Sequence, residues 1–515
     1  MLAILMSLSL VACNKSKEGY VENGELVVIQ DYSDINLGIY GIDTLNPVAT
    51  KSRSVQKIMN IIYEPLFTID ENGKADPVLA DSHSVSETGT QITINLKNGV
   101  KWHDGTNFTA EDVTYTLSKM RDAGGLYGKI SSKIHSFTAV DKKTVVINFV
   151  NKEPSFEYLL TFPIIPRHTA YSEDASYVPM GTGSYKFVSS GGTEMVFEPN
   201  SIWHEGEVSE RKIIVRILRD KQSVVDAFNV GEIDAITSDD LVEGINQKSK
   251  SHTKTMVSEK MVFLGFNMWS DAVASKEIRN AINGFLDRKK IVEQDAYGMA
   301  VATNLSIDPT SWVNTKQQEE VIENYSEKLM EDAGYAIKDG IYQKDGINLS
   351  TRLLVNSENT QRVNVAESIA ATLHVAGINV VVEKVAYEEY VARIAADDFD
   401  MFIGETEVGA NMNPAAMLTD YDNYFNFDAT EIVNTIGRLS TLTDDEEIKK
   451  QINDFSILFY FDPPYLPLYF KTENVIYGSY VSGIEKPVSF DPFKEIEKWY
   501  FYDKDGKESK EKTDE

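Results

Sequence analysis

With 515 residues, the chain is longer than one hydrophobic core usually supports, so we expect two or three domains. Hydrophobic residues make up 42% of it and charged residues 25%, which is typical of globular proteins and excludes an intrinsically disordered chain. The 79 acidic residues outnumber the 50 basic ones and give a net charge of −29. This balance argues against a nucleic-acid partner and against lying flat on anionic lipid, because both rely on clustered cations.

The first segment, residues 1–10, is apolar and leads into a Leu-Val-Ala-Cys run that ends at Cys13, the only cysteine in the chain. A polar stretch follows at once. This pattern is typical of a lipoprotein signal-peptidase site, so we expect residues 1–12 to be a signal peptide and residues 13–24 a tether with a diacylglyceryl group on Cys13. The alternative is a cysteine that packs as a small buried hydrophobe. No Lys or Arg precedes Cys13, which a start codon assigned too late would explain.

A lipid on Cys13 would place the mature protein outside the cytoplasm, held at the cell membrane by the lipid alone. No second apolar run reaches the roughly 18 residues of a membrane span. Because the single cysteine is expected to be acylated, we expect no disulfide in the mature protein, and its stability must come from the size of its core.

Hydrophobic spacing predicts the strands and helices of the first third of the chain. Apolar and alternating stretches predict strands over 26–29, 91–96 and 143–150, and apolar residues three or four apart predict a helix over 55–63. A Thr-x-x-Asp pattern predicts a helix start at 109–112. The buried stripe of that helix is expected to be Val113, Thr116, Leu117 and Met120.

Two later regions share the order strand, helix, strand. The first comprises residues 211–218, 220–230 and 231–236, and the second comprises residues 349–355, 362–374 and 378–385. This order at this spacing predicts βαβ crossovers with parallel strands, so the chain is expected to hold at least two α/β units. Amphipathic helices are predicted over 275–286 and 325–333, an aromatic and proline-rich stretch covers 455–470, and the charged tail 503–515 is expected to be frayed.

The sequence contains no recognisable catalytic or metal-binding pattern. The seven histidines are scattered and form no His-Glu-x-x-His pair, and one cysteine excludes a cysteine-rich zinc site. The Gly-Thr-Gly-Ser-Tyr run at 181–185 lacks the Gly-Lys-Ser/Thr of a phosphate loop and is predicted to be a turn that enters a strand. We therefore expect no cofactor, no metal and no enzymatic activity.

A set of short motifs carries a family resemblance over nearly the whole mature chain. In the first part these are Thr-Leu-Asn-Pro at 44–47, Ile-Tyr-Glu-Pro-Leu at 62–66, Asp-Pro-Val-Leu-Ala at 76–80, Leu-Lys-Asn-Gly-Val-Lys-Trp-His-Asp-Gly-Thr at 96–106 and Phe-Thr-Ala-Glu-Asp-Val at 108–113. Further landmarks follow at 166–168, 181–187, 231–234, 266–267, 278–281, 287–288, 333–335 and 377–378. In this order they closely resemble the oligopeptide, dipeptide and nickel-binding proteins of ABC importers, which are extracellular solute-binding proteins of family 5.

The resemblance implies a two-lobed α/β fold of the periplasmic-binding-protein type (class II), with an extra strand-rich domain inserted in the first lobe. It also implies two chain crossings between the lobes. The expected division is lobe I over 25–55, 178–264 and 474–502, the extra domain over 56–177, and lobe II over 265–473. The hinge is expected at Gly265, Phe266, Asn267, Thr472 and Glu473.

By the same resemblance, function is capture by hinge closure. A ligand that touches both lobes binds the closed form better and so drives closing. The favoured ligand is a peptide, and the expected partners are the permease subunits of an ABC importer, which the protein would serve as a monomer.

The ligand contacts implied by the resemblance lie in a loop of the second lobe. Peptide binders of this family hold the ligand's amine with an Asp in a Trp-containing segment, just before an acidic-Pro pair. The matching stretch, 404–414, has Ala410 at the Asp position, Asn413 before the proline, and no Trp. The candidate contacts are Glu405 and Glu407 as replacement anions and Asn411 and Asn413 as polar contacts, with a solvated loop as the alternative.

Four aromatic residues are further candidates for the cleft. They are Tyr469, close to the second crossing, and the weaker candidates Tyr127, Phe263 and Trp269. Plain core packing is the alternative for each. Two other functions stay open, namely delivery of a ligand to a signalling receptor and an extracellular hydrolase. A nickel complex or a sugar is the alternative ligand for an importer.

Overall fold

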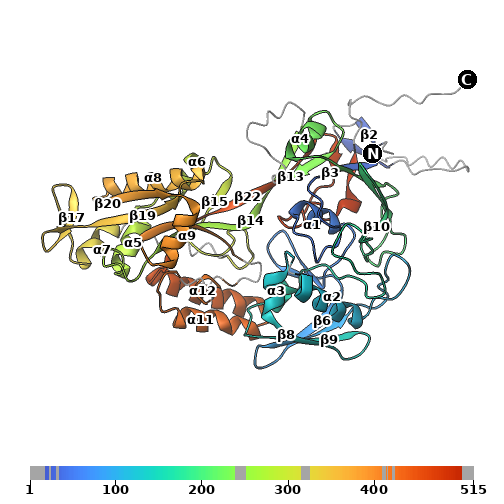
Figure 1. The fold of residues 1–515 in the computed structure, drawn as a ribbon, viewed down its shortest axis with the longest axis horizontal. Coiled ribbons are helices and arrows are strands. Elements are labelled where there is room, and N and C mark those ends of the chain that lie inside the picture. Colours follow the sequence, from blue (N-terminus) through green and yellow to red (C-terminus); the bar gives the residue numbers. More distant parts are fainter. Residues whose placement is uncertain are drawn as a thin grey trace, which may run out of the picture.

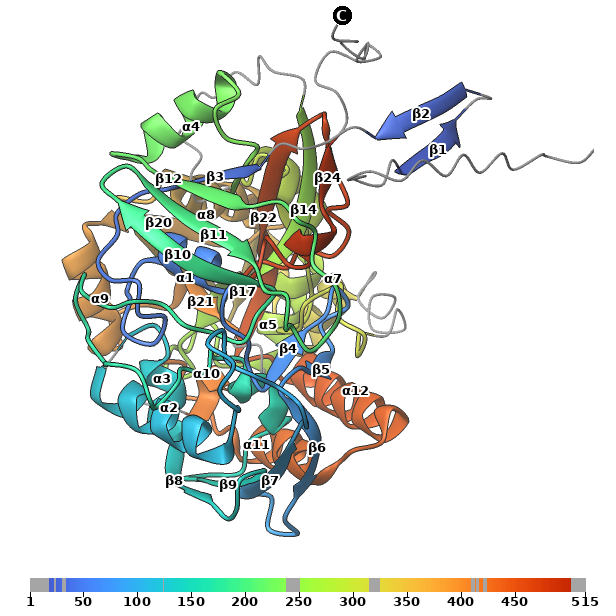
Figure 2. The ribbon, with the colours of Figure 1, turned by 90° about the vertical axis from the view of Figure 1, so that its right-hand side faces the viewer.

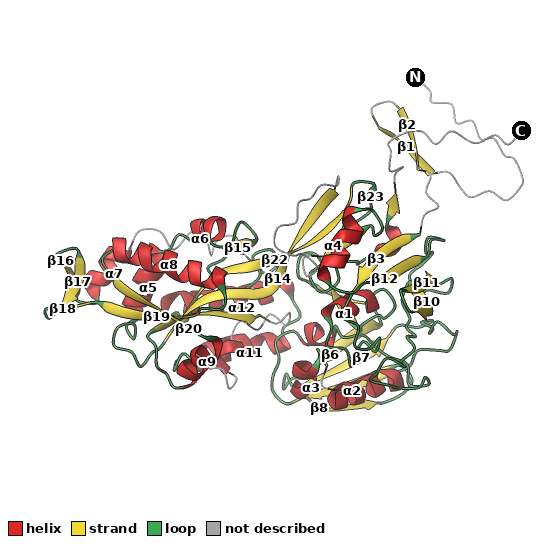
Figure 3. Ribbon diagram, turned by 45° about the horizontal axis from the view of Figure 1, so that its top comes forward, coloured by secondary structure: helices red, strands yellow, loops and turns green. Residues whose placement is uncertain are grey.

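The computed structural model describes residues 18–22, 25–29, 34–123, 125–237, 251–314, 325–408, 413, 416–419 and 424–501. It consists of two bodies that lie side by side (Figure 1). Two long strands, β14 (Ser251–Phe266) and β22 (Tyr465–Gly478), run from one body into the other (Figure 3). The predicted signal peptide, Cys13, Ala410, Asn411 and the charged tail lie outside the described residues.

Lobe I is built on a four-stranded sheet with the order β10-β11-β12-β3 (Figure 2). Strands β12 and β3 are parallel, and the other neighbours are antiparallel. Ile35, Leu37 and Ile39 of β3 are fully buried and alternate with partly buried residues, so one face of the sheet lies on the core. The elements of this lobe are β3 (Ile35–Ile39), α1 (Arg53–Met59), β10 (Tyr185–Gly191), β11 (Glu194–Pro199), β12 (Ile213–Ile217), α4 (Lys221–Asn229), β13 (Ala235–Thr237), β23 (Val481–Ser482), η6 (Ile496–Lys498) and β24 (Tyr500–Phe501), preceded by the hairpin β1 (Glu18–Glu22) and β2 (Glu25–Ile29).

The first predicted βαβ unit is present as β12, α4 and β13, but its two strands do not pair with each other. Strand β12 pairs with β3, and β13 pairs with β22. The amide of Asp234 donates a hydrogen bond to the carbonyl of Asn36 (2.7 Å), which places β3 next to the start of β13. The crossover therefore passes over a strand from far earlier in the chain, which spacing along the sequence cannot reveal.

The extra domain lies below lobe I in Figure 1 and carries an antiparallel sheet with the order β6-β7-β9-β8. Helix α2 begins where predicted, because the carboxylate of Asp112 accepts hydrogen bonds from the amide (2.9 Å) and hydroxyl (3.1 Å) of Thr109. The predicted stripe of α2 is buried. The elements are β4 (Phe67–Ile69), β5 (Ala75–Pro77), β6 (Ala80–Val85), β7 (Gln91–Leu96), α2 (Ala110–Ala123), α3 (Gly128–Lys133), β8 (Ile134–Ala139), β9 (Thr144–Phe149) and η1 (Phe156–Leu160).

Lobe II is built on a mixed sheet covered by helices on both faces. This sheet has the order β13-β22-β14-β21-β19-β20, and it extends into lobe I, where β13 pairs with the end of β22. It includes the second predicted βαβ unit, β19-α8-β20, whose strands are parallel neighbours as predicted. Helices α5 to α8 pack on one face, and α9, α11 and α12 pack on the other. The elements are α5 (Lys276–Phe285), α6 (Arg288–Gln294), β15 (Ala300–Ala302), α7 (Ser326–Asp332), β16 (Ala336–Lys338), β17 (Ile341–Lys344), β18 (Ile347–Asn348), β19 (Ser350–Asn356), α8 (Thr360–Val375), β20 (Asn379–Val385), α9 (Tyr387–Ala395), β21 (Met401–Glu407), α10 (Ala416–Thr419), α11 (Thr430–Gly437), η5 (Arg438–Thr441) and α12 (Asp445–Phe461).

The crossing between the lobes is an antiparallel pair of strands with a bulge. Val257 pairs with Thr472 and Met261 pairs with Phe470, so three residues of β14 face one residue of β22 at this point. Strand β21 joins β14 only from Lys260 onward. The transition from lobe I to lobe II therefore lies at residues 258–260 on β14.

The predicted hinge residues lie at two different places relative to this bulge. Thr472 and Glu473 of β22 lie opposite its start. Gly265 and Phe266 lie inside the lobe II sheet, where Gly265 is flanked by Phe402 and Tyr465 on the neighbouring strands. Asn267 follows the strand, and its side chain donates hydrogen bonds to the carbonyls of residues 397 and 399.

Two glycines allow aromatic rings to pack across the strands of lobe II. Phe263 of β14 lies opposite Gly404 of β21, and Gly265 lies opposite Phe402. The rings of Phe263 and Phe402 meet edge to face with centroids 5.5 Å apart. A Cβ atom on Gly404 would lie 2.3 Å from Cζ of Phe263, so the ring fills the space that a side chain would need.

We predict that Gly404→Ala destabilises the protein by about 1–3 kcal/mol, because the added methyl group forces the Phe263 ring out of its packed position. The midpoint of urea unfolding measures this loss. Gly437→Ala is the matched control. No heavy atom lies within 4 Å of a Cβ at Gly437, which ends α11, so this change should be neutral or stabilise by up to about 1 kcal/mol. Equal midpoints for the two variants would contradict the packing described here.

Candidate ligand-binding cavity

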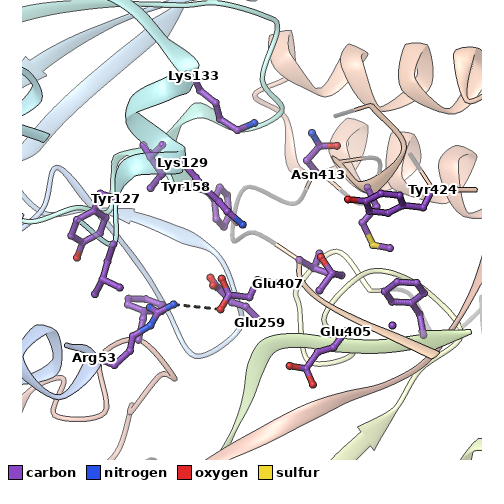
Figure 4. A pocket seen from close by; sticks show the side chains of 18 of the residues that line it. Arg53, Tyr127, Lys129, Lys133, Tyr158, Glu259, Glu405, Glu407, Asn413 and Tyr424 are labelled. Carbon is purple, nitrogen blue, oxygen red and sulfur yellow. Dashed lines mark hydrogen bonds and ion pairs between the residues drawn. The ribbon is translucent and has the colours of Figure 1, made fainter. Parts of the chain in front are cut away.

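A cavity of about 650 Å³ lies between the two lobes (Figure 4). Lobe I contributes residues of α1, the extra domain contributes α3 and η1, and lobe II contributes β14, β21, α8 and α9. The volume falls in the range of small-molecule and cofactor sites. Its charged lining residues are Arg53, Lys129, Lys133, Glu259, Arg362, Glu405 and Glu407.

The structure brings five of the predicted ligand residues together at this cavity and leaves two elsewhere. Tyr127, Phe263, Glu405, Glu407 and Asn413 line the cavity. Trp269 is 72% exposed and Tyr469 is fully buried in the core of lobe II, and neither is a lining residue. Asn411 lies outside the described residues.

Glu405 is already neutralised by two cations of its own lobe. Its carboxylate lies 3.1 Å from Nη2 of Arg362 and 2.5 Å from Nζ of Lys471. Burial opposes ionisation of Glu405, but the hydrogen bond from Lys471 and the charge of Arg362 outweigh it and hold its pKa below the ordinary value. Glu405 therefore helps to hold β21, α8 and β22 together.

Glu407 forms an ion pair that crosses the cavity. Its Oε1 lies 3.5 Å from Nη2 of Arg53, which comes from α1 of lobe I (dashed line in Figure 4). Both side chains are about half exposed, at 48% and 45%, so the pair contributes only about 0–1 kcal/mol. The ion pair therefore connects the two lobes, but it contributes too little free energy to hold them in one arrangement.

Glu259, which sequence reasoning missed, lies on the bulge of β14. Its carbonyl accepts a hydrogen bond from the amide of Val408 (2.8 Å), which fixes the bulge, and its side chain lines the cavity beside Glu407 (Figure 4). Among the described residues, no hydrogen bond or ion pair reaches its carboxylate. Burial, and then repulsion by Glu407, raise the pKa of Glu259 from the ordinary 4.5 to about 7.

Sequence reasoning also missed Tyr158, on the opposite side of the cavity. Its hydroxyl donates a hydrogen bond to the carbonyl of Gly73 (2.7 Å) and accepts one from Nε1 of Trp312 in lobe II (3.2 Å). Lys74 and Asp445 form a further ion pair nearby, with a distance of 2.5 Å. The extra domain and lobe II therefore also touch outside the β14 and β22 crossing.

A second cavity, of about 420 Å³, adjoins the first. Residues shared by both walls are Ile69, Tyr158, Glu259, Val408 and Phe490. The space between the lobes therefore continues past Glu259 instead of ending there, which suits an extended ligand.

In the described part of the chain, no helix has both the length and the hydropathy to cross a membrane. Nor do His, Cys, Asp and Glu side chains form a group of three or more there that is suited to hold a metal ion.

Sequence comparison assigns a family and gives a relative that matches over nearly the full length. Residues 74–427 match the model of the bacterial extracellular solute-binding proteins, family 5 Middle. The chain is 24% identical over 536 residues to the oligopeptide-binding protein AppA of Bacillus subtilis, covering 97% of this chain and 98% of AppA.

Solved structures of similar fold cover about nine-tenths of the chain. One is MppA, a periplasmic murein tripeptide-binding protein in an unliganded open form (TM-score 0.75, 17% identity, 92% of this chain and 98% of MppA). Another is NikZ from Campylobacter jejuni in complex with Ni(L-His) (TM-score 0.61, 21% identity, 91% of this chain and 99% of NikZ). A third is AppA from Bacillus subtilis in complex with a nonapeptide (TM-score 0.59, 21% identity, 92% of this chain and 100% of AppA). They confirm the predicted two-lobed α/β fold class.

We predict that Glu259→Gln stabilises the empty protein at pH 8, on the order of 1–3 kcal/mol, and changes its stability little at pH 4. Between pH 4.5 and about 7 the folded protein keeps a proton on Glu259 that the unfolded chain releases. The stability of the wild type therefore falls with rising pH over this window, and the Gln variant lacks this loss. Urea unfolding of both proteins across this pH range measures the difference.

Glu405→Gln is the matched comparison, and its effect has the opposite sign. The pKa of Glu405 is lowered, so its ionised form stabilises the fold above its ordinary pKa and this contribution is lost as the pH falls. The variant should be less stable than the wild type at pH 8, because Arg362 and Lys471 lose their shared carboxylate. Destabilisation by Glu259→Gln at pH 8 would contradict the description of Glu259 as unpaired.

Proposed function

The chain belongs to the bacterial extracellular solute-binding proteins of family 5, and we propose that it captures a peptide between its two lobes and delivers it to the permease of an ABC importer. The observation that carries the proposal is the cavity whose walls come from lobe I, the extra domain and lobe II. A ligand in this space contacts parts that are joined mainly by two strands. It therefore binds best when the lobes are closed, and this differential affinity shifts the population toward the closed form.

A peptide is the favoured ligand for two reasons. The full-length relative AppA is named an oligopeptide-binding protein, and its solved structure holds a nonapeptide. The cavity of this chain combines aromatic walls with separate acidic and basic groups, and it continues into a second cavity. Aromatic surface suits varied side chains, whereas the polar groups suit a peptide's charged ends and backbone.

We further propose that Cys13 carries the lipid and that the mature protein works outside the cytoplasm as a monomer. A diacylglyceryl group supplies two acyl chains, which anchor stably where one would be marginal. Tethering raises the local concentration of loaded protein at the permease. The proposed role is binding and release, with no covalent bond of the ligand made or broken.

We predict that Val391→Trp weakens peptide binding by at least about tenfold, because the large side chain takes up space in the cavity. Val391 lies on α9, lines the cavity and is 45% exposed, so its replacement should leave the core intact. The measurement is native mass spectrometry titration with a pool of mixed synthetic pentapeptides.

Val381→Trp is the control variant. Val381 is 49% exposed on β20 of the same lobe and is not a lining residue, so wild-type affinity is expected. Unchanged affinity in both variants would argue against this cavity as the ligand site. Retention of one defined non-peptide mass by the purified wild type would overturn the peptide assignment.

A further inference from the structure

Among the charged groups where β14 and β22 cross between the lobes, one carboxylate has no cationic partner in the described part of the chain. The nearby cations are shared between two other acids, since Arg53 pairs with Glu407, and both Lys57 and Lys260 lie 3.9 Å from Glu473. Glu259 lies among these groups, and its carboxylate is bound by none of the described residues.

The bulge explains how this carboxylate reaches the cavity. In a regular strand, neighbouring side chains alternate between the two faces of the sheet. The register shift between Val257 and Met261 interrupts this alternation just where β14 leaves lobe I, and it turns the Glu259 side chain into the space between the lobes. Val408 holds the bulge in place through its amide.

We propose that Glu259 binds the amino-terminal ammonium group of the captured peptide, an inference that rests on the proposed function. An ammonium group has three donors and a full positive charge, so it can bind the free carboxylate of Glu259 and still reach the adjacent Glu407. Glu405 does not serve this role, because Arg362 and Lys471 already occupy its carboxylate.

The position of Glu259 leaves room for the rest of the peptide. Its side chain is part of the wall of the 650 Å³ cavity, of the adjoining 420 Å³ cavity and of a third cavity of about 370 Å³. A ligand anchored by its first residue at this shared wall can extend along either of the two larger cavities.

The raised pKa of Glu259 supports the same assignment. An acid that is disfavoured as an anion in the empty protein gains most from an incoming cation. The ionised, unpaired carboxylate thus lowers the stability of the empty protein. Once the ligand supplies a positive charge, the resulting ion pair stabilises the loaded protein. A structural acid would be expected to have a partner within the protein, as Glu405 has.

The test uses two pools of synthetic pentapeptides that contain no ionisable side chains. One pool has free amino termini, and the other is N-acetylated, so the pools differ in charge only at the first residue. In native mass spectrometry titrations, the wild type should bind the free-amine pool at least about tenfold more tightly than the acetylated pool. In Glu259→Gln this ratio should fall toward one, because the affinity for free-amine peptides drops to that for acetylated ones.

Glu383→Gln is the control, since it removes an acid of lobe II that does not line the cavity. It should keep the wild-type ratio between the pools, because its carboxylate pairs with Arg393 of α9, away from the cavity wall. Circular dichroism on the same samples checks that both variants are folded.

The possible failures can be told apart. Equal binding of both pools by the wild type would overturn ammonium recognition and leave peptide capture standing. A wild-type ratio in Glu259→Gln would overturn the role of Glu259. Binding of neither pool would overturn peptide capture and the ammonium site together.

Discussion

Strands β14 and β22 run antiparallel from lobe I into lobe II, and the placement of the cavity depends on this pair. Each lobe has its own packed core, so the lobes behave as separate bodies wherever these strands do not hold them. The bulge at residues 258–260 falls at the crossing, where the register of the pair changes. A bulge bends and twists a strand locally, which makes this the natural point for one lobe to turn relative to the other.

The ion pairs between the lobes outside this strand pair are weak. Arg53 and Glu407 are half exposed, and so are Lys74 and Asp445, and exposed pairs of this kind contribute about 0–1 kcal/mol each. Trp312 of lobe II adds two hydrogen bonds to the extra domain, from its amide to the carbonyl of Asn72 (2.7 Å) and from its Nε1 to the hydroxyl of Tyr158 (3.2 Å). The differential affinity of the ligand for the open and closed forms acts on top of these contacts. The unpaired Glu259 also favours the closed, loaded form. Its buried carboxylate destabilises the empty protein, and closing on an ammonium group gives that carboxylate a partner.

Much of the fold was predictable because its signals are local. The start of α2 follows from the pairing of Thr109 and Asp112, and the β19-α8-β20 crossover follows from periodicity and spacing. The pairing of β12 with β3 was not predictable, because it joins segments nearly 180 residues apart. The resemblance to family 5 supplied the two-lobed architecture, which periodicity alone does not specify.

The cavity was predictable only in part. Glu405, Glu407 and Asn413 were selected by their places in the stretch that matches the family, and Tyr127 and Phe263 were weaker aromatic candidates; all five line the cavity.

Tyr469 was expected near the cleft, but it faces the helices that cover lobe II. Glu259 was missed because only three-dimensional pairing shows the bulge that turns it inward. The one signal in the sequence is the polar Ser-Glu-Lys run at 258–260, which separates Met256 and Val257 from the apolar residues 261–266 of the strand.

Small-angle X-ray scattering of the mature protein, with and without a saturating peptide, tests capture by lobe closure most directly. If ligand shifts the population toward a closed form around the β14 and β22 crossing, the radius of gyration should decrease when the peptide is added. Superimposable scattering profiles for the empty and the loaded protein, with binding verified on the same samples, would contradict this mechanism.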